Sequence, residues 1–163
     1  MVITGGEPTL QSDLPDFVRK IKEFGFLIKV DTNGTNPEMI EKMNQEKLVD
    51  FWAMDIKAPL GKYAKIAGCP VNLEALKKSI DLVKNSGVDY EFRSTIIQGW
   101  HTLDDIAEMA RMVDGAKIFV LQKFIPRKRL VSADFLNKTS LSDADLRQAA
   151  KECEKLVKKC EVR

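Results

Sequence analysis

Short runs of β-branched and aromatic residues alternate along this chain with longer runs in which apolar residues recur every three or four positions. The short runs predict strands and the longer runs predict amphipathic helices. Strands are expected at residues 2–4, 26–31, 49–56, 90–97 and 118–124, and helices at 12–24, from 37 onward, 73–83, 102–113 and 142–159. Strand–helix alternation repeated about five times is typical of a parallel sheet with outer helices, so we expect an α/β fold.

Length and composition narrow the class of protein. The 163 residues carry a formal charge of +2, and 44% of them are hydrophobic, which is ordinary for a globular domain. We therefore expect one domain over residues 1–163. No apolar run approaches the roughly 20 residues of a membrane span, and no signal peptide is evident. We therefore expect a cytoplasmic protein that binds no membrane. We also expect that it binds no nucleic acid, since the aromatic residues are not interleaved with basic ones.

Polar residues gather where the predicted strands end. Sites in parallel α/β folds lie at the carboxyl ends of the strands, so these groups are expected at one rim. The mixture of carboxylates, cations and amides suits a zwitterionic ligand with hydroxyl groups. The groups are Gly5-Gly6-Glu7, Asp31-Thr32-Asn33-Gly34, Asp55 with Lys57, Arg93 with Thr95, and Gln122.

Each group also has a purely structural interpretation. Gly5 and Gly6 let a ligand approach the main chain, but they also suit a tight turn from strand to helix. Asp55 and Lys57 lie two residues apart, on one face of a strand. They can bind ribose hydroxyls or form a salt bridge. The binding and the structural interpretations both stay open for Gly5 with Gly6 and for Asp55 with Lys57.

The remaining chemically reactive side chains favour structural roles. His101, the only histidine, precedes a predicted helix, and we expect it at the surface or in a helix cap. Cys153 and Cys160 are seven residues apart, so we expect them near one face of the last helix, packed in the core. The basic run 127–129 is expected in a solvated loop, with contact to an anionic partner as the alternative.

Taken in order, five motifs resemble those of the radical S-adenosylmethionine (radical SAM) superfamily. Within it they are similar to the glycyl-radical activating enzymes of anaerobic ribonucleotide reductase and of pyruvate formate-lyase. The resemblance covers nearly the whole chain. The motifs are G-G-E-P-T-L-Q at 5–11, D-T-N-G at 31–34, D-I-K at 55–57, F-R-S-T at 92–95 and L-Q-K-F-I-P at 121–126.

The resemblance implies a fold, a chemistry and partners. The fold would be a (β/α)6 partial barrel. A [4Fe–4S] cluster would be held by a C-x-x-x-C-x-x-C loop and would cleave S-adenosyl-L-methionine to a 5′-deoxyadenosyl radical. That radical would take hydrogen from a glycine of a partner such as anaerobic ribonucleotide reductase. Flavodoxin or ferredoxin would donate the electron.

The resemblance also assigns residues. Gly5, Gly6 and Glu7 would bind the methionine ammonium, Asp55 and Lys57 would lie at the ribose, and Arg93 would lie near the cofactor. No catalytic side chain is assigned. The full cofactor-binding set is Gly5, Gly6, Glu7, Asp31, Asn33, Asp55, Lys57, Arg93 and Gln122, and a monovalent cation would lie at Asp31, Thr32, Ala53 and Asp55.

One departure from the family pattern is large. The three cysteines, Cys69, Cys153 and Cys160, do not form the cluster motif. We expect that the first βα unit, which carries this motif in the family, is missing before Val2, that the barrel is incomplete, and that this chain is inactive alone.

Other expectations follow from the same departure. A non-catalytic module that binds a nucleoside or a partner protein is the alternative, and an unrelated α/β domain with salt bridges at its rim is a third. The exposed edge of the first strand predicts a homodimer.

Overall fold

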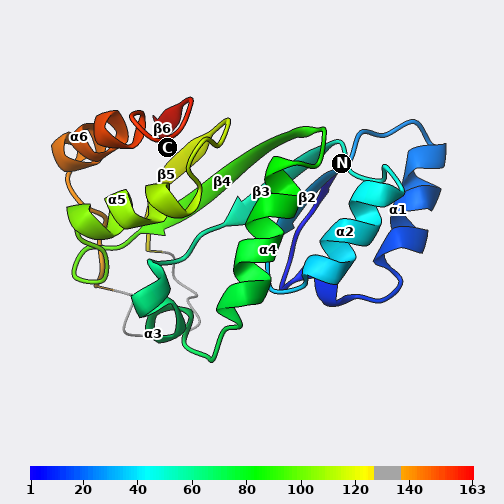
Figure 1. Ribbon diagram of the computed structural model, residues 1–163, viewed down its shortest axis with the longest axis horizontal. Helices are drawn as coiled ribbons and strands as arrows, with labels where there is room; N and C mark the ends of the chain where they lie inside the picture. Colours follow the sequence, from blue (N-terminus) through cyan, green and yellow to red (C-terminus); the bar gives the residue numbers. More distant parts are fainter. Residues whose placement is uncertain (127–136) are drawn as a thin grey trace. The chain divides into compact units, whose positions relative to one another are not determined.

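The computed structural model describes residues 1–126 and 137–163, and Figure 1 shows its ribbon. The basic run at 127–129 lies outside the described residues. Six parallel strands form one sheet in chain order, β1-β2-β3-β4-β5-β6, which confirms the predicted α/β fold with parallel strands and outer helices. The strands are β1 (Val2–Ile3), β2 (Lys29–Thr32), β3 (Phe51–Asp55), β4 (Asp89–Ile96), β5 (Phe119–Lys123) and β6 (Cys160–Val162).

Helices follow the strands along the chain, and most begin at a side-chain cap. Asn36 and Asn72 accept hydrogen bonds from the first amides of α2 and α4, and Thr102 forms a reciprocal capping box with Asp105 at α5. The helices are η1 (Pro8–Leu10), α1 (Leu14–Glu23), α2 (Pro37–Gln45), η2 (Leu60–Lys62), α3 (Tyr63–Ala67), α4 (Leu73–Lys84), α5 (Leu103–Met112) and α6 (Asp143–Cys153).

The chain divides into two compact units. Unit 1 comprises residues 1–55 and 70–92, and unit 2 comprises residues 56–69 and 93–163. Unit 1 holds β1 to β3 with α1, α2 and α4, and α2 lies beside α4 (Figure 1). Its core consists of fully buried apolar side chains, among them Ile28, Val30, Ile40, Met43, Trp52, Leu76 and Phe92.

A buried tryptophan links a strand of unit 1 to two of its helices. The indole Nε1–H of Trp52 in β3 donates to Asn44 Oδ1 in α2 at 2.8 Å, and Asn44 Nδ2 donates to the carbonyl of Leu82 in α4 at 3.1 Å. The Trp52 side chain is fully buried, so this partner removes the penalty of burying its N–H group. One asparagine therefore joins three elements.

Unit 2 contains β5, β6, the end of β4 and the helices α3, α5 and α6, of which α5 and α6 pack together. Its core is built from fully buried side chains of strands and helices, namely Ile96, Ile106, Met109, Phe119, Leu121 and Leu146.

Two predicted segments differ from the structure. The last helix does not run to residue 159 but ends at Cys153, and Cys160 begins a strand that the sequence did not predict. The amides of Lys158 and Phe119 bond to the carbonyls of Ala116 and Lys159, so pairing with β5 replaces the next helical turns. The segment 58–71, where no helix or strand was expected, contains η2 and α3.

The strand β1 lies at one end of the strand order and is only two residues long. Large apolar side chains of unit 1 are exposed on it and on the segments that follow, namely Met1, Val2, Leu10, Phe17, Phe24, Phe26 and Leu27. Across residues 1–126 and 137–163, no helix combines the length and the hydropathy that crossing a bilayer requires.

Candidate functional site

Three strands of unit 1 bring their predicted site residues to one edge of the sheet. β1 pairs in parallel with β2, and β2 with β3, so their carboxyl ends lie together. Gly5 and Glu7 follow β1, residues 31–33 end β2, and Asp55 ends β3. The structure thus gathers this part of the predicted site from three separate stretches of sequence.

The Glu7 carboxylate is the centre of this edge. Its Oε1 accepts hydrogen bonds from the Thr9 hydroxyl at 2.6 Å, the Thr9 amide at 3.2 Å and the Thr32 hydroxyl at 2.7 Å. Its Oε2 accepts from the Asn33 amide at 2.6 Å. Thr9 and Thr32 are buried, and no role was predicted for Thr9 within its motif. The Glu7 side chain therefore fastens the loop after β1 to the end of β2.

The main chain at Gly5 and Gly6 is open. A Cβ atom added at either glycine would meet no atom within 4 Å, and Gly5 has a φ of +143°, which side-chain-bearing residues rarely adopt. Gly6 also lines a hollow of about 300 Å³ together with Thr4, Glu7 and Phe17. A ligand can therefore approach the peptide groups of this loop closely.

The D-T-N-G segment after β2 forms a tight turn. Asn33 Oδ1 accepts from the Thr35 amide at 2.9 Å, and Thr32 Oγ1 accepts from the Gly34 amide at 3.1 Å. Gly34 has a φ of +76°, and a Cβ atom there would overlap the side-chain methyl of Met54. Asn33 thus shapes this turn through its side chain and also binds Glu7 through its amide.

The predicted cation-binding residues adjoin one another in the sheet. Asp31 is the register partner of Ala53, and Thr32 is the partner of Met54, one residue before Asp55. Lys29 Nζ lies 3.8 Å from Asp31 Oδ1. A lysine ammonium therefore already supplies positive charge near one of these carboxylates.

The other predicted cofactor residues belong to unit 2. Lys57 follows β3 by two residues, and its side chain is exposed. Arg93 lies in β4 and Gln122 in β5, and both are half-buried.

His101 is buried rather than placed at the surface. Its side chain is 3% exposed, its Nδ1 accepts from the Ile97 amide at 3.1 Å, and its Nε2 lies 2.9 Å from the Lys57 carbonyl oxygen. The surface or capping role predicted from the sequence was therefore wrong. A single histidine in a loop carries no sequence signal for a contact 44 residues away.

The three cysteines lie outside the loop after β1. Cys69 is exposed in unit 2, whereas Cys153 and Cys160 are buried. The hydrogen bond between the two buried thiols lowers the pKa of Cys153 and raises that of Cys160. Within the described part of the chain, no three His, Cys, Asp or Glu side chains gather closely enough to hold a metal ion.

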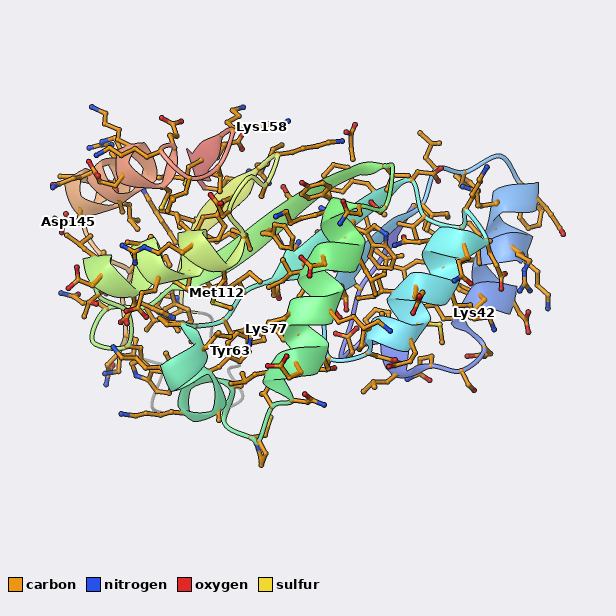
Figure 2. The ribbon with its side chains drawn as sticks, in the orientation of Figure 1. Lys42, Tyr63, Lys77, Met112, Asp145 and Lys158 are labelled. Carbon is orange, nitrogen blue, oxygen red and sulfur yellow. The ribbon has the colours of Figure 1, made fainter. Side chains whose placement is uncertain are left out.

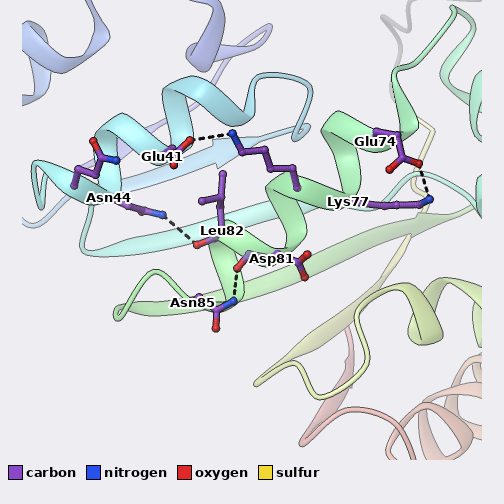
Figure 3. A pocket seen from close by; sticks show the side chains of 9 residues that line it. Glu41, Asn44, Glu74, Lys77, Asp81, Leu82 and Asn85 are labelled. Atoms are coloured by element: carbon purple, nitrogen blue, oxygen red, sulfur yellow. Dashed lines mark hydrogen bonds and ion pairs between the residues drawn. The ribbon is translucent and has the colours of Figure 1, made fainter.

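A second hollow in unit 1, about 670 Å³ in volume, lies between α2 and α4 and contains none of the predicted site residues. Figure 3 marks interactions of its polar side chains with a neighbouring side chain and with the main chain. Lys77 Nζ lies 2.7 Å from Glu74 Oε1, and Asn85 Nδ2 donates to the Asp81 main-chain carbonyl at 2.9 Å. We interpret it as a solvent-filled groove between two helices.

An ion pair stabilises the segment that follows Lys57. Lys62 Nζ donates to both carboxylate oxygens of Asp105, at 2.8 and 2.9 Å, and the Thr102 amide donates to Asp105 Oδ2 at 2.9 Å. Burial acts to raise the pKa of Asp105, but the hydrogen bonds from Lys62 and Thr102 outweigh it and hold that pKa below its usual value.

We predict that Glu7→Gln destabilises the protein by about 1–3 kcal/mol, because an amide nitrogen replaces an oxygen that accepts hydrogen bonds from buried groups. Urea denaturation measures the loss. Glu23→Gln, at an exposed position, makes the same charge change and is the control. Equal effects of the two substitutions would contradict the proposal that Glu7 holds the loop after β1 to the end of β2.

We predict that Asp105 makes stability depend on pH. Its folded pKa lies below the unfolded value of about 3.9, so its contribution is present above about pH 4 and is lost as pH falls through the folded pKa. The stability difference between the native chain and Asp105→Asn should shrink on acidification. Urea denaturation from pH 7 to about 3 tests this, with exposed Asp104→Asn as control; a gap that stayed constant with pH would contradict it.

Comparison with known proteins gives the family. The model of the radical SAM superfamily matches residues 1–113. Two proteins of Methanocaldococcus jannaschii, each named "Putative glycyl-radical enzyme activating enzyme", are similar in sequence. One is 36% identical over 162 residues, which cover 96% of this chain and 67% of the relative. The other is 29% identical over 124 residues, which cover 71% of this chain and 45% of the relative.

Solved structures share the fold. A domain of pyruvate-formate lyase-activating enzyme from Bacteroides vulgatus superposes with a TM-score of 0.76 at 19% identity, covering 100% of this chain and 98% of that one. Archaeal TYW1 superposes with a TM-score of 0.65 at 19% identity, covering 96% of this chain and 49% of that one. The family model and the 36% identical relative together show that this chain belongs to the radical SAM superfamily.

Proposed function

We propose that the protein is the core of a radical SAM activase that acts in the cytoplasm on a glycine of a glycyl-radical enzyme, such as anaerobic ribonucleotide reductase. Flavodoxin or ferredoxin would be its electron donor. Membership of the superfamily and the names of its relatives support the class of reaction. The observation that carries the proposal is the open main chain of Gly5 and Gly6, at the carboxyl end of a parallel strand.

S-adenosylmethionine suits the hydrogen-bond acceptors at this edge. An ammonium group needs acceptors. Gly5 and Gly6 are exposed, with open space around their main chain, so we propose that their peptide carbonyls supply them. The Glu7 carboxylate already holds Thr9, Thr32 and Asn33, so we propose that it keeps the loop in shape for the ammonium. In this family S-adenosylmethionine supplies a 5′-deoxyadenosyl radical when it is bound beside a reduced cluster.

The other assignments are part of the same proposal. Lys57 and Asp55 would bind the ribose hydroxyls, with Asp31, Asn33, Arg93 and Gln122 completing the cofactor site. A monovalent cation would be held by Asp31, Thr32, Ala53 and Asp55. The parallel register, which sets Asp31 opposite Ala53, supports this cation site.

The residues present do not fit a [4Fe–4S] cluster. Such a cluster needs cysteine thiolates at one point, whereas Cys69 is exposed in unit 2 and the other two cysteines are buried with each other. We therefore propose that these 163 residues do not carry out the radical step by themselves.

The cysteine positions also favour a second candidate, a non-catalytic module that binds a nucleoside or a partner protein. The intact mass of the native protein from its source cells separates the two. A mass well above 18.4 kDa, with further peptides that contain three cysteines, supports the activase. A mass that matches this chain supports the binding module.

A homodimer through the edge of β1 is a further prediction. The exposed strand edge and the apolar side chains beside it, such as Val2 and Leu27, favour pairing with a second copy. Light scattering on a concentration series should show a rise toward twice the monomer mass, and Val2→Lys should suppress it. A constant monomer mass at high concentration would contradict the dimer.

We predict that Gly6→Val weakens S-adenosylmethionine binding without unfolding the chain. A side chain at Gly6 meets no protein atom within 4 Å, so it leaves the fold intact, but it occupies the space the ligand needs. Loss of charge-assisted hydrogen bonds should weaken affinity by about tenfold or more. Titration of the ¹⁵N-labelled protein with S-adenosylmethionine, followed by NMR, measures this even for weak binding.

Gly61→Val is the matched control. A Cβ atom at Gly61 likewise meets no atom within 4 Å, but this glycine lies in η2 of unit 2. The control should bind as the native chain does. Native-like binding by Gly6→Val, or no binding by the native chain, would overturn the proposed site.

A further inference from the structure

The two residues after β3 have all their main-chain polar groups satisfied within unit 2. The Ile56 amide donates to the Arg93 carbonyl at 2.7 Å, and the Ile56 carbonyl accepts from the Ser94 hydroxyl at 2.6 Å. Ser94 is buried and Ile56 is fully buried. The main chain that leads into Lys57 is therefore held by β4.

Two buried aromatic side chains hold Lys57 itself. Its amide donates to the Tyr63 hydroxyl oxygen at 3.2 Å, and its carbonyl faces His101 Nε2 at 2.9 Å. Tyr63, at the start of α3 (Figure 2), is 2% exposed. Two buried polar side chains thus meet at the main chain of one exposed lysine.

The contacts of His101 determine its tautomer. Nδ1 accepts from the Ile97 amide, so it carries no proton. The ring is then neutral, with its proton on Nε2, and this proton is donated to the Lys57 carbonyl. Only this arrangement lets one side chain serve both partners, because a doubly protonated ring cannot accept from Ile97.

The supports of the two aromatic residues are joined to each other. Lys62 directly precedes Tyr63, and Thr102 directly follows His101. The Lys62 ammonium binds Asp105, which also accepts from the Thr102 amide. An ion pair and a capping box therefore keep Tyr63 and His101 in place at the main chain of Lys57, and we call these two side chains the clamp.

We propose that His101 and Tyr63 are positioning residues for Lys57: they fix its main chain, so that its side chain starts from one fixed point when the ammonium binds a ligand. This inference rests on the proposed function, in which Lys57 binds a ribose hydroxyl. Fixing the Cα–Cβ direction leaves only the side-chain torsions to be ordered when the ligand binds, which lowers the entropy lost on binding.

The test uses the whole chain with Tyr63→Phe, His101→Leu, His101→Gln and Lys57→Ala. Tyr63→Phe removes only the hydroxyl, and Tyr90→Phe, a buried tyrosine of unit 1, is its control. Amide exchange at Lys57 should become about five- to tenfold faster in Tyr63→Phe and stay unchanged in Tyr90→Phe. Gln at 101 can both accept and donate, and should restore most of what Leu removes.

Binding of S-adenosylmethionine, measured by NMR titration, separates positioning from general damage. Lys57→Ala and His101→Leu should each weaken binding by about tenfold. The double variant should be no weaker than Lys57→Ala alone, because His101 acts through Lys57. General damage to the fold would instead make the two effects multiply.

The outcomes are distinguishable. Native-like affinity in both Tyr63→Phe and His101→Leu, or multiplying effects in the double variant, would overturn the clamp while the proposed function stands. No binding by the native chain would overturn the proposed function, and Lys57 amide exchange would still decide whether the main chain is fixed. Unchanged exchange in Tyr63→Phe would overturn the clamp in either case. If His101→Leu fails to fold, Tyr63→Phe with Lys57→Ala completes the cycle.

Discussion

One half-buried carboxylate, Glu7, sets the shape of the edge where the strands of unit 1 end. Such a group needs several donors to offset the loss of water, and Glu7 accepts four hydrogen bonds from Thr9, Thr32 and Asn33. Those donors come from the loop after β1 and from the end of β2. The loop is therefore tied to the sheet by charge-assisted bonds, and its two glycines remain available to a ligand through their peptide groups alone.

Unit 2 solves the same problem with neutral side chains. After β3 the chain leaves the sheet, and its peptide groups need partners in a buried setting. Ser94, Tyr63 and His101 supply them within unit 2. In both units, polar side chains near strand ends hold the main chain, so the residues that project from it are presented in a defined direction.

The sequence predicted the alternation of strands and helices and the placement of motifs at strand ends, because both follow from local periodicity. It did not predict β6, which forms because residues 160–162 pair with β5, a contact beyond local pattern. Nor could it predict which residues of the motifs hydrogen-bond to one another. Only the fold brings Thr32 and Asn33 to Glu7, and only the fold buries His101 against Lys57.

The different burial of Trp52 and Trp100 makes the two units optically separable. The chain has two tryptophans: Trp52 is fully buried in unit 1, whereas Trp100 is half-buried in unit 2. Indole emission shifts to longer wavelength when water reaches the ring. The blue-shifted signal therefore reports on the core of unit 1, and the red-shifted signal reports on unit 2. The tryptophan emission of the unmodified chain, followed during unfolding, therefore distinguishes two cases: both halves of this sheet unfold together, or one unfolds before the other.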